Sequence, residues 1–122
     1  MSASRLETDL AVQLRGARIP HEREVPGLVP SRRYRVDFLV RPDLVVECQG
    51  GLFASRRTGR RGVGHTSTAK MLSDMARRND LVCAGYRVLE VSRKHVDDGR
   101  ALAWIERALG CRRGKGDAQG VD

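Results

Sequence analysis

The chain has 122 residues, a length typical of one domain, and its 40% hydrophobic content excludes a wholly disordered chain. No stretch is apolar enough to predict a membrane span, and the N-terminus has no signal-peptide pattern, so we expect a cytoplasmic protein with no membrane partner. The three cysteines are too few and too widely spaced to predict a disulfide framework or a zinc site.

The net charge of +8 favours a phosphate-rich partner such as nucleic acid, although a generally basic surface is the alternative interpretation. Residues 32–61 carry eight arginines and three acids, a net charge of +5 in thirty residues. Only five residues of the chain are aromatic. Because base stacking needs aromatic side chains, single-strand binding by stacking and an RNA-binding protein are both less favoured interpretations.

The first half of the chain predicts a helix followed by three strands. An apolar stripe recurs at steps of three and four in residues 3–17, which predicts a helix with Glu7 beside the stripe. Residues 21–25 form a candidate edge strand. Residues 35–40 alternate in polarity, and residues 44–49 are largely apolar, so we expect two strands that form a hairpin around Pro42 and Asp43.

The second half predicts a glycine- and arginine-rich loop at 50–65, a helix, a strand at 86–91 and a last helix. The first of these helices begins at Thr66 or Ser67, ends near Cys83 and has a predicted buried face of Leu72, Met75, Ala76, Val82 and Cys83. Ser92 or Asp97 begins the last helix, whose predicted buried face is Ala101, Leu102, Ile105, Ala108 and Leu109. We expect residues 111–122 to form a disordered tail.

This order of elements predicts an α/β fold with a mixed central sheet flanked by helices. The helix at 66–83 connects two strands as a crossover, so strands 44–49 and 86–91 should be parallel. We expect a single domain over residues 1–110.

Two acids, Asp37 and Glu47, lie on the two strands of the predicted hairpin. Asp37 alone fits an exposed strand acid, but Glu47 follows three apolar residues, and a buried charge is costly unless it is paired or bound to metal. Two neighbouring carboxylates can hold a hard divalent ion such as Mg²⁺. Such an ion supports phosphodiester hydrolysis, and the nearby arginines would hold the polyanion.

Asp37 followed by Glu47-Cys48-Gln49 resembles the motif of the PD-(D/E)XK, or restriction-endonuclease-like, superfamily. The chain is similar to small, often phage-encoded endonucleases of the very-short-patch-repair type over residues 5–100. The resemblance is carried by an ordered set of segments: Arg35–Phe38, Glu47–Gly51, Gly64–Thr66, Asp74, Asn79 and Gly85–Leu89. It implies a restriction-endonuclease-like core.

The resemblance implies that Asp37, Glu47 and the Cys48 carbonyl bind the metal, Mg²⁺ or Mn²⁺. Glu7 matches a first-helix glutamate that assists the metal or its waters, although a solvated helix acid is an equal alternative. Very-short-patch-repair enzymes also carry a structural zinc site. The cysteines and histidines here do not supply one, so mismatch repair is not transferred to this chain.

Gln49 departs from the superfamily pattern, which has lysine at this position. An amide carries no charge and cannot donate a proton as an ammonium group can, so the group that activates water is left open. His65 is the first substitute, since imidazole exchanges protons near neutral pH, and Lys70 is the second. The alternative for His65 is an exposed histidine. For Asp74 we favour an intrahelical salt bridge to Arg77 or Arg78 over a role in the site.

The predicted DNA contacts are basic side chains near this motif: Arg32, Arg33, Arg35, Arg56, Arg57, Arg60, Arg61 and Lys70. A solvated charge run is the alternative for the 56–61 group. The leading hypothesis is a Mg²⁺-dependent DNA endonuclease in which Asp37, Glu47, Gln49, Glu7 and His65 are the catalytic residues. The main alternative is a nuclease-like module that binds DNA without cutting it. Action as a monomer or as a homodimer stays open.

Overall fold

The computed structural model describes the backbone of residues 4–50 and 61–121, and the side chains of 4–50 and 68–110. The elements, in chain order, are α1 (Arg5–Gly16), β1 (Glu22–Pro26), β2 (Arg35–Val40), β3 (Leu44–Cys48), α3 (Arg61–Cys83), β4 (Arg87–Val91), α4 (Arg93–Asp97) and α5 (Arg100–Val121). The predicted first helix and four strands are therefore confirmed within one or two residues at their ends.

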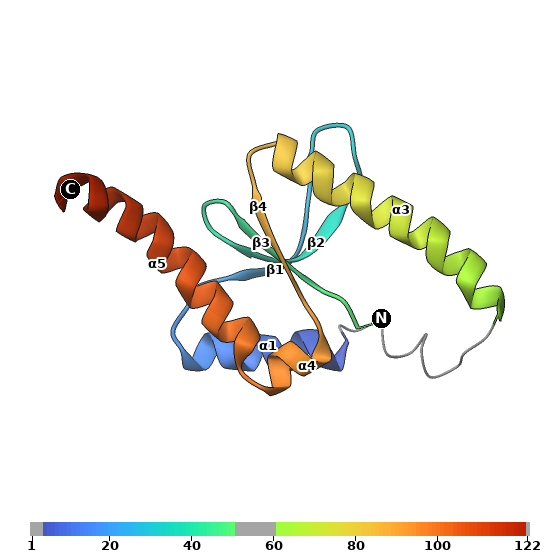
Figure 1. The fold of residues 1–122 in the computed structure, drawn as a ribbon, viewed down its shortest axis with the longest axis horizontal. Coiled ribbons are helices and arrows are strands. Elements are labelled where there is room, and N and C mark those ends of the chain that lie inside the picture. The colour runs from blue at the N-terminus through green and yellow to red at the C-terminus, as the bar shows by residue number, and fades with distance from the viewer. Residues whose placement is uncertain (1–3, 51–60, 122) are drawn as a thin grey trace.

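The four strands form one mixed sheet in the order β1-β2-β3-β4 (Figure 1). The β1–β2 and β2–β3 pairs are antiparallel, and β3 and β4 are parallel. Helix α3 is the crossover between the two parallel strands, as the sequence predicts. The α/β fold with a mixed sheet flanked by helices is confirmed.

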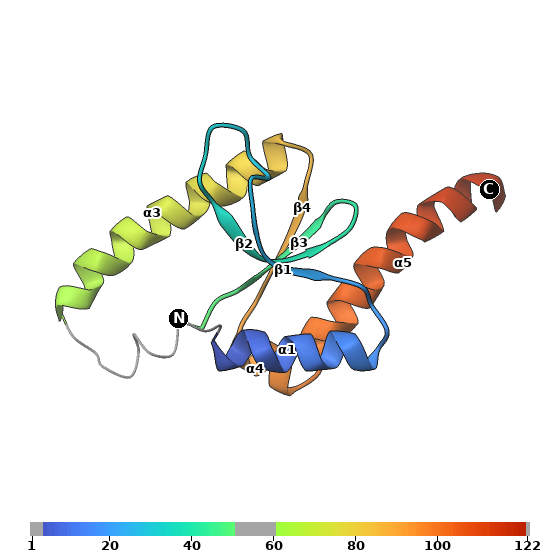
Figure 2. The ribbon, with the colours of Figure 1, turned by 180° about the vertical axis from the view of Figure 1, so that it is seen from behind.

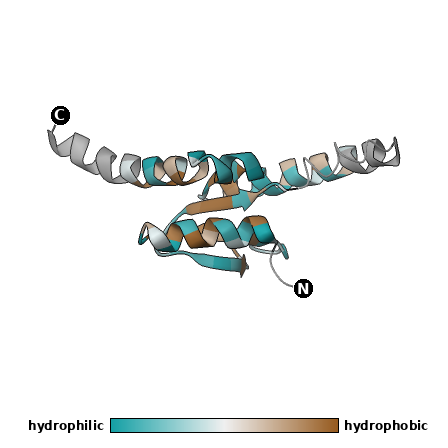
Figure 3. Ribbon diagram, turned by 90° about the horizontal axis from the view of Figure 1, so that it is seen from below, coloured by the Kyte–Doolittle hydropathy of each residue, from teal (hydrophilic) through white to brown (hydrophobic). Residues whose placement is uncertain are grey.

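Helices lie on both sides of the sheet, with α1 and α4 on one side and α3 on the other (Figures 1 and 2). The larger apolar cluster joins α1, the sheet, α4 and α5, and its fully buried members include Leu10, Phe38 and Ile105. A smaller cluster joins Leu39 and Val45 of the sheet to Leu81 of α3. In Figure 3, which is coloured by hydropathy, a hydrophobic part of the sheet lies between the helices. Asp37 and Glu47 therefore belong to strands that pack on both faces.

Helix ends follow the local sequence. The Ser4 hydroxyl accepts a hydrogen bond from the Glu7 backbone N at 3.2 Å, which caps α1. The sequence predicts one last helix, whereas the structure has two, since Gly99 adopts a left-handed φ of 86° between α4 and α5. Glycine has no Cβ to oppose that conformation, so the chain turns there at low cost. Ser92, the N-cap of α4, matches one of the two predicted starts.

Helix α3 differs from its prediction in both its start and its buried face. The helix begins at Arg61, so residues 61–65 of the predicted loop are helical, and residues 51–60 lie outside the described part. Leu72 and Val82, predicted to be buried, are 62% and 55% exposed, whereas Leu81 is 1% exposed. The prediction of the apolar face was wrong because the face of α3 that meets the sheet carries arginines.

The C-terminal helix α5 continues to Val121, through residues for which the sequence predicts a disordered tail. Its described side chains end at Gly110, and the tail stays a prediction. Ala101 and Ile105 are fully buried, as predicted. None of the helices in the described residues has the length and apolar character needed to cross a bilayer.

Candidate metal centre

One acidic residue from each strand lies in a single row across the sheet. The β1–β2 pairs on both sides of Glu24 share one register, which places Glu24 across from Asp37. The β2–β3 register, continued by one residue, places Asp37 across from Glu47. Glu47 is paired in turn with Glu90. We call these four residues the acidic row.

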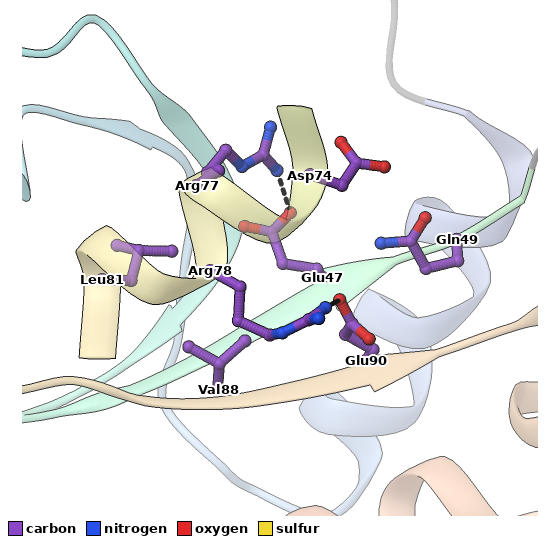
Figure 4. Close-up of a pocket in the computed structure, with 8 residues that line it drawn as sticks. All are labelled: Glu47, Gln49, Asp74, Arg77, Arg78, Leu81, Val88 and Glu90. Atoms are coloured by element: carbon purple, nitrogen blue, oxygen red, sulfur yellow. Dashed lines mark hydrogen bonds and ion pairs between the residues drawn. The ribbon is translucent and has the colours of Figure 1, made fainter. Parts of the chain in front are cut away.

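Like charges directly opposite each other destabilise a sheet, so the acidic row requires compensating cations. Helix α3 supplies two of them (Figure 4). Arg77 Nη2 donates to Glu47 Oε1 at 2.6 Å, and Arg78 donates to Glu90. The Glu47 side chain is only 6% exposed, so its ion pair with Arg77 is largely shielded from water. The Glu47–Glu90 half of the row is therefore neutralised by α3.

The other half of the row gathers a further acid, and one arginine lies beside it. Glu7 of α1, Glu24 and Asp37 each offer a carboxylate oxygen, and these three oxygens lie within 4.8 Å of one another. Arg23 Nη2 lies 3.8 Å from Glu7 Oε1, and the Cys48 backbone N donates to Asp37 Oδ2 at 2.7 Å. Glu7, predicted from the sequence, thus joins Asp37, and Cys48 contacts Asp37 through its backbone.

Burial and mutual repulsion perturb the acids of this centre. Burial, followed by the neighbouring Glu24 and Asp37 carboxyls, raises the pKa of Glu7 to about 8. Burial is also the main cause that raises the pKa of Glu47 to about 7, with Arg77 acting in the opposite direction and Asp37 adding to the increase. Both groups thus hold their protons more tightly than an exposed glutamate.

Two oxygens of the centre lack a hydrogen-bond donor: Glu7 Oε1 and Glu47 Oε2 are both buried without one. Buried carboxylate oxygens without a hydrogen-bond donor are costly, and a bound cation reduces that cost. The available donors are carboxylate oxygens, which suit Mg²⁺ and Mn²⁺ and not a soft metal. The residues present therefore fit the metal that the sequence resemblance implies.

Gln49 lines a pocket beside the acidic row, together with Glu47, Asp74, Arg77 and Arg78. Its amide points toward the Glu47 side of this pocket (Figure 4). The departure from lysine thus lies next to the predicted metal ligand. Asp74 does not pair with either arginine in the structure.

Lys70 instead pairs with Asp74, at 3.4 Å between Nζ and Oδ2, and its side chain is 64% exposed. Lys70 is absent from the lining of the Gln49 pocket. His65 lies in the first turns of α3, but its side chain is outside the described part of the chain.

The predicted DNA contacts are divided between described and undescribed parts of the chain. Arg32, Arg33 and Arg35 are exposed, and Arg32 Nε lies 3.7 Å from Asp80 Oδ2. The predicted contacts Arg56, Arg57 and Arg60 lie outside the described residues, as does the side chain of Arg61.

Sequence reasoning missed Glu24 and the role of Arg77. Glu24 lies in a short strand with no distinctive pattern, and only the strand register brings it to Asp37. Arg77 was predicted to pair within its own helix, whereas it reaches Glu47 on the sheet. One signal in the sequence could have indicated the face of α3 that meets the sheet. It is the spacing by three and four residues of Asp74, Arg77, Arg78 and Leu81.

The mixed sheet with helices on both sides is a fold that also occurs in a solved endonuclease catalytic domain. The structure is similar to the catalytic domain of the homing endonuclease I-Bth0305I, with a TM-score of 0.55 and 18% sequence identity. The similarity covers 89% of this chain and 93% of that domain. No protein-family model matches the chain, and no curated protein matches it. The likeness shows the fold.

Proposed function

We propose that the protein is a Mg²⁺-dependent DNA endonuclease of the PD-(D/E)XK type, which hydrolyses phosphodiester bonds by nicking or by structure-specific cleavage. The observation that carries this proposal is the position of Asp37 across from Glu47, with an unpaired carboxylate oxygen buried beside it. The likeness to a homing endonuclease catalytic domain supports it. The net charge of +8 suits a polyanionic substrate.

In this proposal Asp37, Glu47 and the Cys48 carbonyl hold Mg²⁺ or Mn²⁺. The ion, when bound, stabilises the negative charge that develops on the phosphate oxygens. The Gln49 amide oxygen accepts a hydrogen bond from the attacking water and orients it, but it cannot remove the proton. Glu7 assists the metal or its waters. His65 assists proton transfer, because an imidazole exchanges protons near neutral pH.

Arginines hold the DNA backbone on either side of this centre. Arg32, Arg33 and Arg35 are exposed before and at the start of β2, the strand that carries Asp37. We propose that they contact phosphates together with Arg56, Arg57, Arg60, Arg61 and Lys70. Phosphate contacts of this kind fix the position of the duplex without reading its sequence.

The test is cleavage by the purified chain of plasmid, nicked, mismatched and branched DNA with Mg²⁺ or Mn²⁺. We expect at least one substrate to be cut by the parent, and the rate to fall by at least a hundredfold in Asp37→Asn and Glu47→Gln, as expected when metal-mediated stabilisation of the transition state is lost. Glu106→Gln, an exposed acid on α5, is the matched control and should cut as the parent does. Absence of cleavage on every substrate would contradict the proposal, as would equal cleavage by the two variants.

A second candidate is a nuclease-like module that binds DNA without cutting it. Two observations favour it: glutamine stands at the lysine position, and Arg77 already neutralises Glu47 at 2.6 Å. A binding module should keep its DNA affinity when divalent ions are removed with a chelator and should show no cleavage when they are restored. Titration of labelled duplex with and without Mg²⁺ separates the two candidates.

A cytoplasmic location and association into a homodimer stay predictions. A dimer would allow both strands to be cut in one complex, whereas a monomer would nick. Sedimentation of the protein alone and with DNA measures the number of copies bound, and a single copy on cleaved duplex would argue against the dimer.

A further inference from the structure

Glu24 is an acid with no place in the motif that identified the site. The β1–β2 register sets it across from Asp37, and its carboxylate lies within 4.8 Å of ligand atoms of Glu7 and Asp37. Its backbone φ is 50°, a left-handed value that is uncommon for a residue with a side chain. The chain thus places a charged residue in a costly conformation beside two other acids.

The charges around Glu24 do not balance among the described residues. Glu7, Glu24 and Asp37 provide up to three negative charges when ionised, and Arg23, 3.8 Å from Glu7, is the cation that the structure pairs with them. With all three acids ionised, their negative charges exceed the charge of this cation by two. On the opposite side of Asp37, by contrast, Glu47 already has Arg77.

A separate observation also indicates a ligand at this centre. Glu47, which is not one of the three clustered acids, has a side chain that is 6% exposed, and its Oε2 has no hydrogen-bond donor. Asp37 lies across from Glu47 in the sheet and is also a member of the cluster with Glu7 and Glu24. Glu7, itself 9% exposed, contributes a second buried oxygen without a donor. Each of these two glutamates, one in the cluster and one across from Asp37, thus has a buried oxygen without a hydrogen-bond donor.

We propose that Glu24 is a direct ligand of the divalent cation, which it holds together with Glu7 and Asp37 on the β1 side of Asp37. This inference rests on the proposed function for the presence of a metal at Asp37, and it adds Glu24 to the residues that bind the metal. Three carboxylates leave positions for water and one phosphate oxygen in the six-oxygen coordination that Mg²⁺ and Mn²⁺ prefer.

The test measures Mn²⁺ binding to the full chain by calorimetry and by the signal of free Mn²⁺ in electron paramagnetic resonance, both without DNA. We expect Glu24→Gln to weaken Mn²⁺ binding at least tenfold. Glu22→Gln, on the same strand and exposed, should bind within twofold of the parent. Parent-like affinity in Glu24→Gln would overturn the inference, and so would an equal loss in Glu22→Gln.

A second variant and the melting temperature keep the test decisive. Glu24→Gln removes a repelling charge, so its metal-free melting temperature should equal or exceed that of the parent, and added Mn²⁺ should raise it less. Should this variant fail to fold, Glu24→Asp, which keeps the charge on a shorter side chain, takes its place with the same criterion: unchanged Mn²⁺ affinity overturns the inference.

The outcomes also separate this inference from the proposed function. A Glu24-dependent Mn²⁺ site in a protein that cuts no DNA supports the site and contradicts the nuclease. Cleavage with unchanged Mn²⁺ affinity in the Glu24 variant supports the nuclease and contradicts the role of Glu24.

Discussion

At the scale of single residues, the raised pKa of Glu7 has a consequence for stability. Below about pH 4.5 Glu7 is protonated in both the folded and the unfolded chain, so it does not make stability depend on pH. Between pH 4.5 and its folded pKa of about 8, the folded state holds a proton that the unfolded state has released. Stability therefore falls as the pH rises through this window, and the full penalty is present above it.

We expect Glu7→Gln to remove part of this fall in the metal-free protein. The free energy of unfolding, measured by urea denaturation between pH 5 and 8.5, should decline less steeply in the variant than in the parent. Glu106→Gln on the exposed side of α5 serves as the control and should decline as the parent does. A Glu7→Gln curve parallel to the parent curve would show that Glu7 titrates alike in both states.

Arg77 and Arg78 are adjacent in sequence but differ in the burial of their partners. Glu47, the partner of Arg77, is 6% exposed at its side chain, whereas Glu90, the partner of Arg78, is 36% exposed. Arg77→Gln should destabilise the protein by about 1–3 kcal/mol, because it leaves a buried acid without its cation. Arg78→Gln should cost less than about 1 kcal/mol. Equal losses in chemical denaturation would contradict this assignment.

At the scale of elements, the strands could be predicted from sequence better than the faces of the helices. Alternation in 35–40 and the apolar run after Leu44 are local signals, and both strands form as expected. The buried face of α3 could not be predicted from its apolar residues, because the sheet it covers presents acids. Arg77 and Arg78 form ion pairs with those acids, and among the described side chains of α3 (68–83) only Leu81 is fully buried. Glu24 depends on register between strands, which no local pattern reveals.

The difference between the predicted and the observed buried face of α3 can be tested with two of its leucines. Leu81→Ala should destabilise the protein by about 2–5 kcal/mol, since it removes a side chain that is 1% exposed. Leu72→Ala, at 62% exposure, should change stability by less than about 0.5 kcal/mol. The opposite order of the two free energies would mean that α3 packs by the face that its sequence pattern favours.

At the scale of the whole molecule, the charge of +8 should make the proposed binding of DNA strongly dependent on salt. Each phosphate contact adds about 0.9 to the slope of log affinity against log salt concentration. Arg32→Gln and Arg33→Gln, both exposed before β2, should each lower this slope by up to about 0.9. Arg107→Gln on α5 is the control, and filter binding over a series of salt concentrations supplies the measurement. Unchanged slopes would place the DNA elsewhere.

The topology of the sheet also bears on how the protein folds. Strands β1, β2 and β3 are antiparallel neighbours along the chain, whereas β4 joins only after the α3 crossover. Because short-range pairings form early, Glu24, Asp37 and Glu47 should meet before Arg77 arrives. We expect Glu24→Gln to accelerate refolding in stopped-flow experiments, and Arg77→Gln to act mainly on the unfolding rate. The reverse pattern would mean that α3 docks first. If the three antiparallel strands pair first, as we expect, repulsion among Glu24, Asp37 and Glu47 slows the earliest step of folding.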